Sequence, residues 1–209
     1  MVAGLSANIG KVLRIDLTVG RIWEEKLDEA SLRMYVGGTG LGSKFLYDEV
    51  KPGTQWNDPE NRLILASGPI GGAKVAGSGS YSVVTKGPLT NGATSTQANG
   101  YFGAYLKFCG FDAVIIQGKA TTWKYLYIHD GIAELLDAKN IIGMDTWEIE
   151  SQIKKELGMT RRALSVVGIG PAGENLVRFA AIVGDEGHVA AHNGVGAVMG
   201  SKKLKAVAA

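Results

Sequence analysis

The chain has 209 residues, of which 45% are hydrophobic and 20% are charged. These proportions are typical of a globular protein with a core large enough for one sizeable domain. The net charge of +2 argues against nucleic-acid binding. No segment approaches the roughly 18 consecutive apolar residues of a membrane span.

Cysteine usage narrows the chemistry further. A single cysteine, Cys109, excludes an internal disulfide and any zinc or iron–sulfur site whose thiolates come from this chain alone. The first 17 residues lack a charged region followed by a continuous apolar stretch, so no signal peptide is expected. We therefore expect a reduced, cytoplasmic environment.

In the first half, residues 12–17 and 21–27 alternate apolar and polar side chains around the turn 18–20, which predicts a hairpin. Asp28 is suited to cap a helix that extends to Tyr35. The pattern then predicts, in chain order, a helix over 42–49 and strands over 63–66 and 81–85.

The second half repeats these signals. Asp130-Gly131 lies between two alternating segments and favours a hairpin. Asp145 and Glu148 have the spacing of a capping box at the start of a helix that ends at Gly158. The full set of predicted elements is a helix over 100–108, a strand over 113–116, a hairpin over 124–128 and 132–136, a helix over 145–157, and strands over 164–167, 177–182 and 204–208.

The two halves therefore resemble each other in the order of their elements. Each contains a hairpin, a helix, an apolar strand that ends in Gly-Pro, a glycine-rich bend and a further strand. This order indicates an internal repeat over roughly 8–90 and 110–209 within a single domain spanning 1–209, because no Pro- or Ser-rich linker separates the halves. Coincidence among short apolar strands is the alternative.

Glycine is the one composition value that departs from the average. The chain has 30 glycines and 5 prolines, and the glycines form short clusters between apolar segments. Glycine is needed where the backbone takes a positive φ or approaches another group closely. The clusters predict several tight loops that meet around a ligand or around each other.

One cluster, residues 168–173, matches the GxGxxG pattern of dinucleotide-binding loops. Pro171 lies inside it, however, and residues 174–179 are more typical of a strand than of a helix. Without a helix N-terminus the loop lacks the usual phosphate contact. A nucleotide-binding domain with a parallel sheet remains an alternative that predicts helices after each Gly-Pro loop.

The titratable residues give weak signals. His188 and His192 are four residues apart, a spacing that would place both rings on one face of a helix, but no third metal ligand is evident. Glu174 is interpreted as a buried carboxylate that holds a turn, and Cys109 as a packing residue. His129 is expected to be exposed beside its hairpin turn.

Four segments resemble one known family: IGKVLRIDLTVGRI (9–22), SYSVVTKGPLT (80–90), NGYFGAYLKFCGFDAVIIQGKA (99–120) and the stretch from VGIGPAGENLVRF to GVGAVMGSKKLKAVAA (167–209). The chain is similar to the N-terminal domain of the aldehyde ferredoxin oxidoreductase family over essentially its whole length. The resemblance implies an α+β fold of duplicated β3-α-β3 units that form two mixed sheets and together cradle a pterin cofactor.

The resemblance also implies a tungsten (or molybdenum) bis-pterin, with a magnesium ion that bridges the pterin phosphates and contacts Gln97 and the Ala190 carbonyl. The family usually has arginines at the positions of Ser80, Val189 and Asn193, which here lack that charge. The implied cofactor-binding residues are Lys74, Ser80, Tyr81, Gln97, Asn99, Gly100, Val189, Ala190, Ala191, His192, Asn193 and Gly194.

The activity implied is oxidation of an aldehyde to a carboxylic acid, with ferredoxin or an iron–sulfur subunit as electron acceptor. The 4Fe-4S cluster and the catalytic residues are expected in C-terminal domains or a separate subunit, so residues 1–209 alone are expected to be inactive and to work within an oligomer. Two alternatives stay open: a cradle fold that has lost its cofactor and serves binding or assembly, and a component of an aromatic-thioester reductase of the same family.

Overall fold

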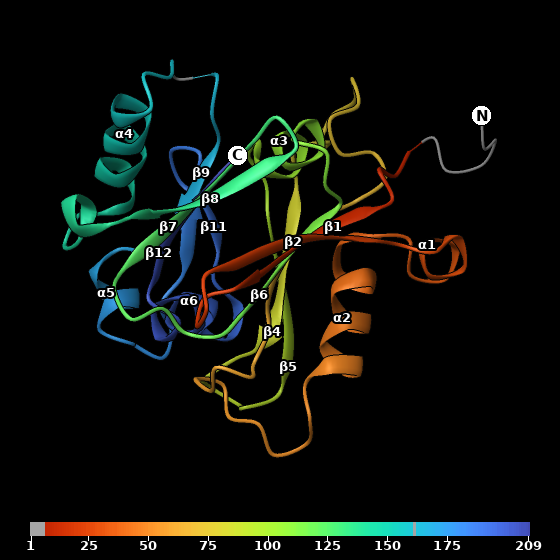
Figure 1. Ribbon diagram of the computed structural model, residues 1–209, viewed down its shortest axis with the longest axis horizontal. Coiled ribbons are helices and arrows are strands. Elements are labelled where there is room, and N and C mark those ends of the chain that lie inside the picture. The colour runs from red at the N-terminus through yellow and green to blue at the C-terminus, as the bar shows by residue number, and fades with distance from the viewer. Residues whose placement is uncertain (1–6, 161) are drawn as a thin grey trace.

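The computed structural model describes residues 7–160 and 162–209 and contains two six-stranded mixed sheets. Figure 1 shows helix α2 and helix α4 on opposite outer sides of the molecule, with the two sheets between them. Among the described residues, no helix has the length and apolar character needed to cross a membrane.

The first sheet, sheet A, has the strand order β2-β1-β6-β3-β4-β5. Its β1 and β6 are parallel, and every other neighbouring pair is antiparallel. Its strands are β1 (Lys11–Asp16), β2 (Arg21–Lys26), β3 (Leu63–Ser67), β4 (Tyr81–Lys86), β5 (Ala93–Ala98) and β6 (Ala113–Gln117).

Sheet B has the order β8-β7-β12-β9-β10-β11, with β7 and β12 parallel and the other pairs antiparallel. The topology of sheet A is thus repeated strand for strand, and the predicted α+β fold of duplicated units is confirmed. Because each sheet has a single parallel pair, the alternative of a nucleotide-binding domain built on a parallel sheet is excluded. The strands are β7 (Lys124–His129), β8 (Ile132–Asp137), β9 (Val166–Gly168), β10 (Ile182–Gly184), β11 (His188–Ala190) and β12 (Leu204–Ala208).

The helices begin largely where their caps predict. The Asp28 carboxylate accepts the Ser31 N–H at the start of the first helix, and Asp145 and Glu148 form the expected capping box. The helical segments are α1 (Glu29–Tyr35), α2 (Gly38–Glu49), α3 (Phe102–Phe108), η1 (Lys139–Ile141), α4 (Thr146–Glu156), α5 (Pro171–Glu174), η2 (His192–Gly194) and α6 (Val195–Ser201).

Two expectations need correction. Helix α2 begins at Gly38, four residues before its predicted start, because its first turn contains two glycines that favour a loop on propensity alone. The strand predicted over 177–182 is wrong: Pro171 starts the one-turn helix α5, and the next strand, β10, begins only at Ile182. Strands β5 and β11 and helix α6 were not predicted from the sequence.

Three hydrophobic clusters hold the layers together. The largest lies between the sheets and includes Phe102, Phe111 and Val207. A second packs α4 against sheet B, and a third packs Leu41 and Phe45 of α2 against sheet A. Each sheet is therefore buried on its inner face and partly covered on its outer face by one helix.

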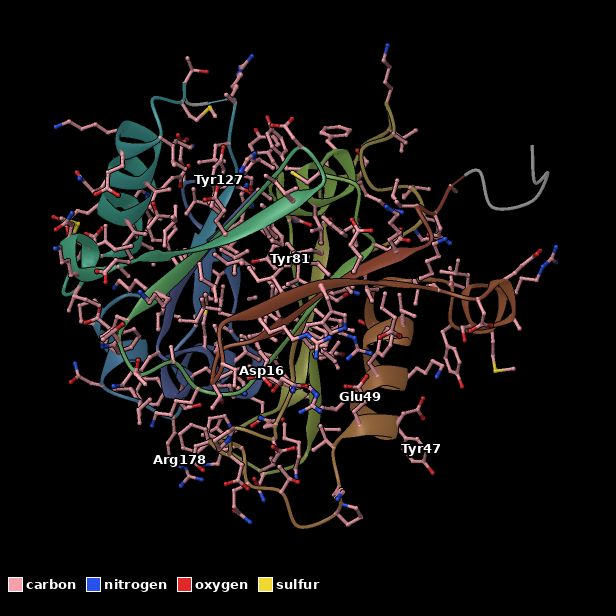
Figure 2. All side chains as sticks on the ribbon, viewed as in Figure 1. Asp16, Tyr47, Glu49, Tyr81, Tyr127 and Arg178 are labelled. Carbon is pink, nitrogen blue, oxygen red and sulfur yellow. The ribbon has the colours of Figure 1, made fainter. Side chains whose placement is uncertain are left out.

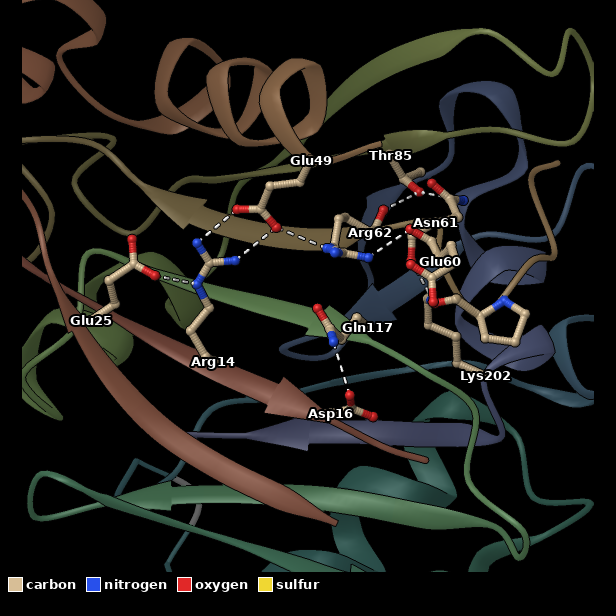
Figure 3. A network of polar contacts seen from close by, with 11 residues as sticks. Arg14, Asp16, Glu25, Glu49, Glu60, Asn61, Arg62, Thr85, Gln117 and Lys202 are labelled. Carbon is tan, nitrogen blue, oxygen red and sulfur yellow. Dashed lines mark hydrogen bonds and ion pairs between the residues drawn. The ribbon is translucent and has the colours of Figure 1, made fainter. Parts of the chain in front are cut away.

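A buried charge network fixes the end of α2 to sheet A (Figure 3). The Glu49 carboxylate accepts hydrogen bonds from Arg14 and Arg62 at 2.7–2.9 Å. Burial alone would raise the pKa of Glu49, but the bonds from the two guanidinium groups keep that pKa below its ordinary value. The network positions α2, and with it the loop that precedes this helix.

Candidate functional site

The predicted site residues lie on three segments that the fold brings to one seam between the sheets. Strands β4 and β5 pair up to Tyr81 and Ala98, so that Ser80 and Asn99 lie just beyond the end of this ladder. The Ser80 hydroxyl donates to Asn99 Oδ1 at 3.0 Å. Strand β11 contacts β5, and the His192 N–H donates to the Thr96 hydroxyl at 3.3 Å. The last strands of the two sheets therefore meet here.

Gly100 allows the two loops at this seam to approach closely. Its φ is +99°, and a Cβ at this position would lie 2.6 Å from Asp185 Oδ2 and 3.1 Å from the His188 ring. The Asp185 carboxylate in turn accepts the N–H groups of Tyr101 and Phe102 at 2.6 and 3.1 Å. A buried carboxylate of sheet B thus holds the start of α3 in place.

A cavity of about 360 Å³ opens beside this seam, between the start of α2 and the loop 68–80. Its lining includes Ser80, Ser82 and Gln97 together with backbone of both loops. The described residues that line it include no lysine, arginine, aspartate or glutamate. The cavity therefore offers peptide groups, hydroxyls and one amide side chain as its hydrogen-bonding groups.

Gly68 is one of the glycines that line this cavity. A Cβ at Gly68 would meet no heavy atom within 4 Å, and its φ lies outside the positive range, so neither packing nor backbone conformation demands glycine there. A neutral, oxygen-rich concavity of this kind suits a phosphate ester and a hard cation, which favour peptide N–H donors and amide or carbonyl oxygens respectively.

The other predicted residues surround the seam in different ways. Lys74 lies at the exposed tip of the loop and makes no hydrogen bond or ion pair with any described residue. The Tyr81 ring is buried in the core, 5.0 Å from the Phe102 ring between centroids, and its hydroxyl has no partner among the described residues. Burial raises the pKa of that hydroxyl above its ordinary value.

Some groups of the segment after β11 already make hydrogen bonds and close contacts within the fold. The Asn193 amide donates to the Thr90 hydroxyl at 2.9 Å and accepts the Leu89 N–H at 3.1 Å, which ties this segment to the β4–β5 turn. Gly194 has φ +73°, and a Cβ there would lie 1.9 Å from the Arg178 carbonyl oxygen. Ala190 is buried, whereas Val189, Ala191 and His192 are exposed.

The remaining candidates have structural roles. Glu174 accepts the Gly143 N–H at 3.0 Å and pairs with Lys205, so the prediction of a carboxylate that holds a turn is confirmed. Cys109 is half-buried, and burial raises the pKa of its thiol to about 11. His188 lies in β11 and His192 in η2, so the helical spacing considered for a metal does not arise.

The described residues contain no group of three or more His, Cys, Asp or Glu side chains arranged for a metal ion. Any cation at the seam would therefore depend on carbonyl and amide oxygens. Sequence analysis missed Asp185, Gly68 and the start of α2 as parts of this site. The glycines at 37–40 were noted as a cluster, but only the fold shows that they face the cavity.

Comparison with known proteins shows which family has this sequence and this fold. The sequence profile of the aldehyde ferredoxin oxidoreductase N-terminal domain matches residues 12–209. The tungsten-containing aldehyde ferredoxin oxidoreductase of Pyrococcus furiosus is 45% identical over 201 residues, which are 96% of this chain and 33% of that protein. The WOR-like subunit of the aliphatic sulfonate oxidoreductase of the same organism is 38% identical and covers 96% of this chain and 34% of its own length.

A solved structure gives the same result. A chain of the active site complex BamBC of benzoyl coenzyme A reductase, in complex with 1,5-dienoyl-CoA, superimposes with a TM-score of 0.93 at 37% identity. The match covers 97% of this chain and 31% of that chain. The chain thus spans about a third of the length of the relatives it matches.

Proposed function

We propose that this chain forms the binding surface for a pair of pterins that hold tungsten or molybdenum. The premise is that the chain belongs to the aldehyde ferredoxin oxidoreductase family as its N-terminal domain. The observation that carries the proposal is an open cavity lined by Ser80, Ser82 and Gln97, beside the seam where β5 contacts β11, the strand that ends at the buried Ala190. A seat of this kind has to be concave, and these residues do not pack it shut.

In this proposal, the neutral groups of the chain hold the anionic end of the cofactor. The Gln97 amide and the Ala190 carbonyl would contact a magnesium ion, and the cavity hydroxyls and peptide N–H groups would face the phosphates. Lys74, at the exposed tip of the loop 68–80, would supply a positive charge. The bound cofactor supplies the redox chemistry, while these residues orient it and exclude water.

The whole enzyme would oxidise an aldehyde to a carboxylic acid, with the added oxygen atom taken from water and two protons released, and pass the two electrons to ferredoxin through an iron–sulfur cluster outside this chain. The remaining two thirds, present in the relatives, would supply that cluster and the catalytic residues. A cytoplasmic, oligomeric enzyme is consistent with this role. Reduction of an aromatic thioester by the same cradle is an alternative, since a benzoyl coenzyme A reductase component shares the fold.

A second function is favoured by one observation. The Asn193 side chain, placed where a phosphate contact is expected, is already bonded to Leu89 and Thr90. Polar groups that already hydrogen-bond to one another are less available to bind a ligand. In that case the chain would be a non-catalytic binding or assembly module.

Metal and pterin content separates the two functions. The chain would be produced together with a polypeptide that supplies the remaining two thirds, in cells given tungstate, and assayed for tungsten and for fluorescent oxidised pterin. We expect one metal per two pterins and a loss of both in Gln97→Leu, but not in Gln55→Leu, a glutamine in an exposed loop. A folded complex without metal or pterin would favour the second function. Residues 1–209 alone should not reduce a dye acceptor with any aldehyde, and turnover would contradict this.

A further inference from the structure

The outer face of sheet A carries a groove that the proposed cofactor seat does not use. It lies between the C-terminal half of α2 and the outward side of β4 and β5, with a volume of about 1070 Å³. Its apolar wall includes Leu46, Tyr47, Val50 and Val84. The groove is larger than the cavity at the start of α2 and lies along the same helix.

The C-terminal half of α2 forms one wall of the groove. Leu41, Phe45 and Leu46 pack against sheet A in a buried cluster, and Val50 packs against this cluster. Leu46 and Val50 also line the groove at its edge, together with Ser43 and Tyr47. Tyr47 is 87% exposed, and Figure 2 shows it extending away from the end of α2. A large exposed aromatic side chain beside an apolar groove is typical of an interaction surface.

The floor of the groove is shaped for a close neighbour. The outward residues of β5, Ala93 and Ser95, are small and both line the groove. Helix α2 itself is pressed onto β4, since a Cβ at Gly42 would lie 2.6 Å from Val84 Cγ2. The helix therefore lies mainly over β3 and β4 and reaches β5 to a smaller extent, while Ala93 and Ser95 of β5 still line the groove. A sheet face of this kind is usually completed by a second helix in the same layer.

We infer that this groove receives a helix from the polypeptide that forms the other two thirds of the full-length relatives. The inference rests on the proposed function, because it takes this domain to work with that polypeptide. Two observations select this occupant. The chain accounts for only 33% of the Pyrococcus furiosus relative, so a large partner surface exists in the whole enzyme. The groove also continues into the cofactor seat, because Ser95 lines the groove and Gln97, two residues further along the same face of β5, lines the cavity.

The experiment is hydroxyl-radical footprinting of two proteins. One is residues 1–209 alone, and the other is a hybrid in which this chain replaces the matched third of the Pyrococcus furiosus relative. Tyr47 should be oxidised at least tenfold more slowly in the hybrid, whereas Met34 on α1, which is 72% exposed and outside the groove, should keep its rate. In the hybrid, Tyr47→Lys combined with Val50→Asp should raise the oxidation of Leu46. The matched change Met34→Lys should not.

The native Pyrococcus furiosus enzyme provides a measurement that does not depend on the hybrid. The segment aligned with residues 46–50 should be protected there to the level of core residues. Oxidation of that segment at the rate of exposed loops would overturn the inference. So would protection of Tyr47 in residues 1–209 alone that increases with concentration, because the occupant would then be a second copy. Tungsten and pterin content of the same hybrid reports separately on the proposed function, so a protected groove without cofactor removes only that function.

Discussion

Lys202 joins the two sheets, and its removal should destabilise the domain strongly. The side chain is 1% exposed, and its ammonium donates to the carbonyl oxygens of Asn61, Pro59 and Gly118 at 2.6, 3.2 and 3.3 Å. Pro59 O also accepts the Gly118 N–H, so Lys202→Met would orphan chiefly the other two carbonyls. Each buried, unsatisfied carbonyl costs about 1–3 kcal/mol. We expect a loss of about 2–4 kcal/mol at pH 7.

The loss should grow with pH. Burial lowers the pKa of the Lys202 ammonium to about 7, from 10.5, with Arg62 acting in the same direction and Glu60, Asp16 and Asp58 opposing it. Between these values the unfolded chain binds a proton that the folded protein has released, so the free energy of unfolding rises with pH. This contribution is complete above pH 10.5 and is lost as pH falls towards 7. Each pH unit adds about 1.4 kcal/mol, and the variant lacks this gain.

Urea unfolding of both proteins at pH 7, 8 and 9 measures this difference directly. The gap between wild type and Lys202→Met should widen by about 2–3 kcal/mol across that range. Lys203→Met is the matched control, because the neighbouring ammonium donates to a single exposed carbonyl, that of Thr121. It should change stability by about 0.5 kcal/mol or less at every pH. A constant gap for Lys202→Met would show that the three carbonyls keep the ammonium charged, and the reasoning would be refuted.

Four further changes test the seam and one hairpin. Asp185→Ala should cost about 3 kcal/mol in urea unfolding, because two N–H groups at the start of α3 lose their acceptor; an unchanged midpoint would contradict this. Gly100→Ala should lower the free energy of unfolding by about 1–3 kcal/mol, because of the positive φ and the contact with Asp185. Ser80→Arg, at the cavity rim, should leave the melting temperature nearly unchanged. Hydrogen bonds from His129 to Glu134 and Asp130 raise the pKa of the imidazole despite partial burial. Its stabilising effect should be present below pH 6.5 and disappear as pH rises through the raised pKa, and His129→Gln should remove this dependence.

The elements that sequence analysis predicted well are those in which local chemistry and packing agree. Asp28 and Asp145 cap their helices, and Asp130-Gly131 closes its hairpin, because short polar side chains and a positive φ determine these turns locally. The strand predicted over 177–182 was wrong for the opposite reason. Its apolar residues suggest a strand, but Pro171 starts a helical turn and Leu176 has φ +57°, which turns the chain before β10.

The elements that were missed are largely those that build the site. Strand β5 (ATSTQA) has no large apolar residue and no apolar–polar alternation, β11 has three residues, and α2 starts with two glycines in its first turn. None of them is stable by itself, and each is held in place by the neighbouring sheet. A core position tolerates little besides an apolar side chain, whereas a seat for a polar ligand needs small residues and free hydrogen-bonding groups, the composition that local patterns assign to loops. The segments without a strong local signal are therefore the ones that line the open cavity at the start of α2 or form the seam beside it.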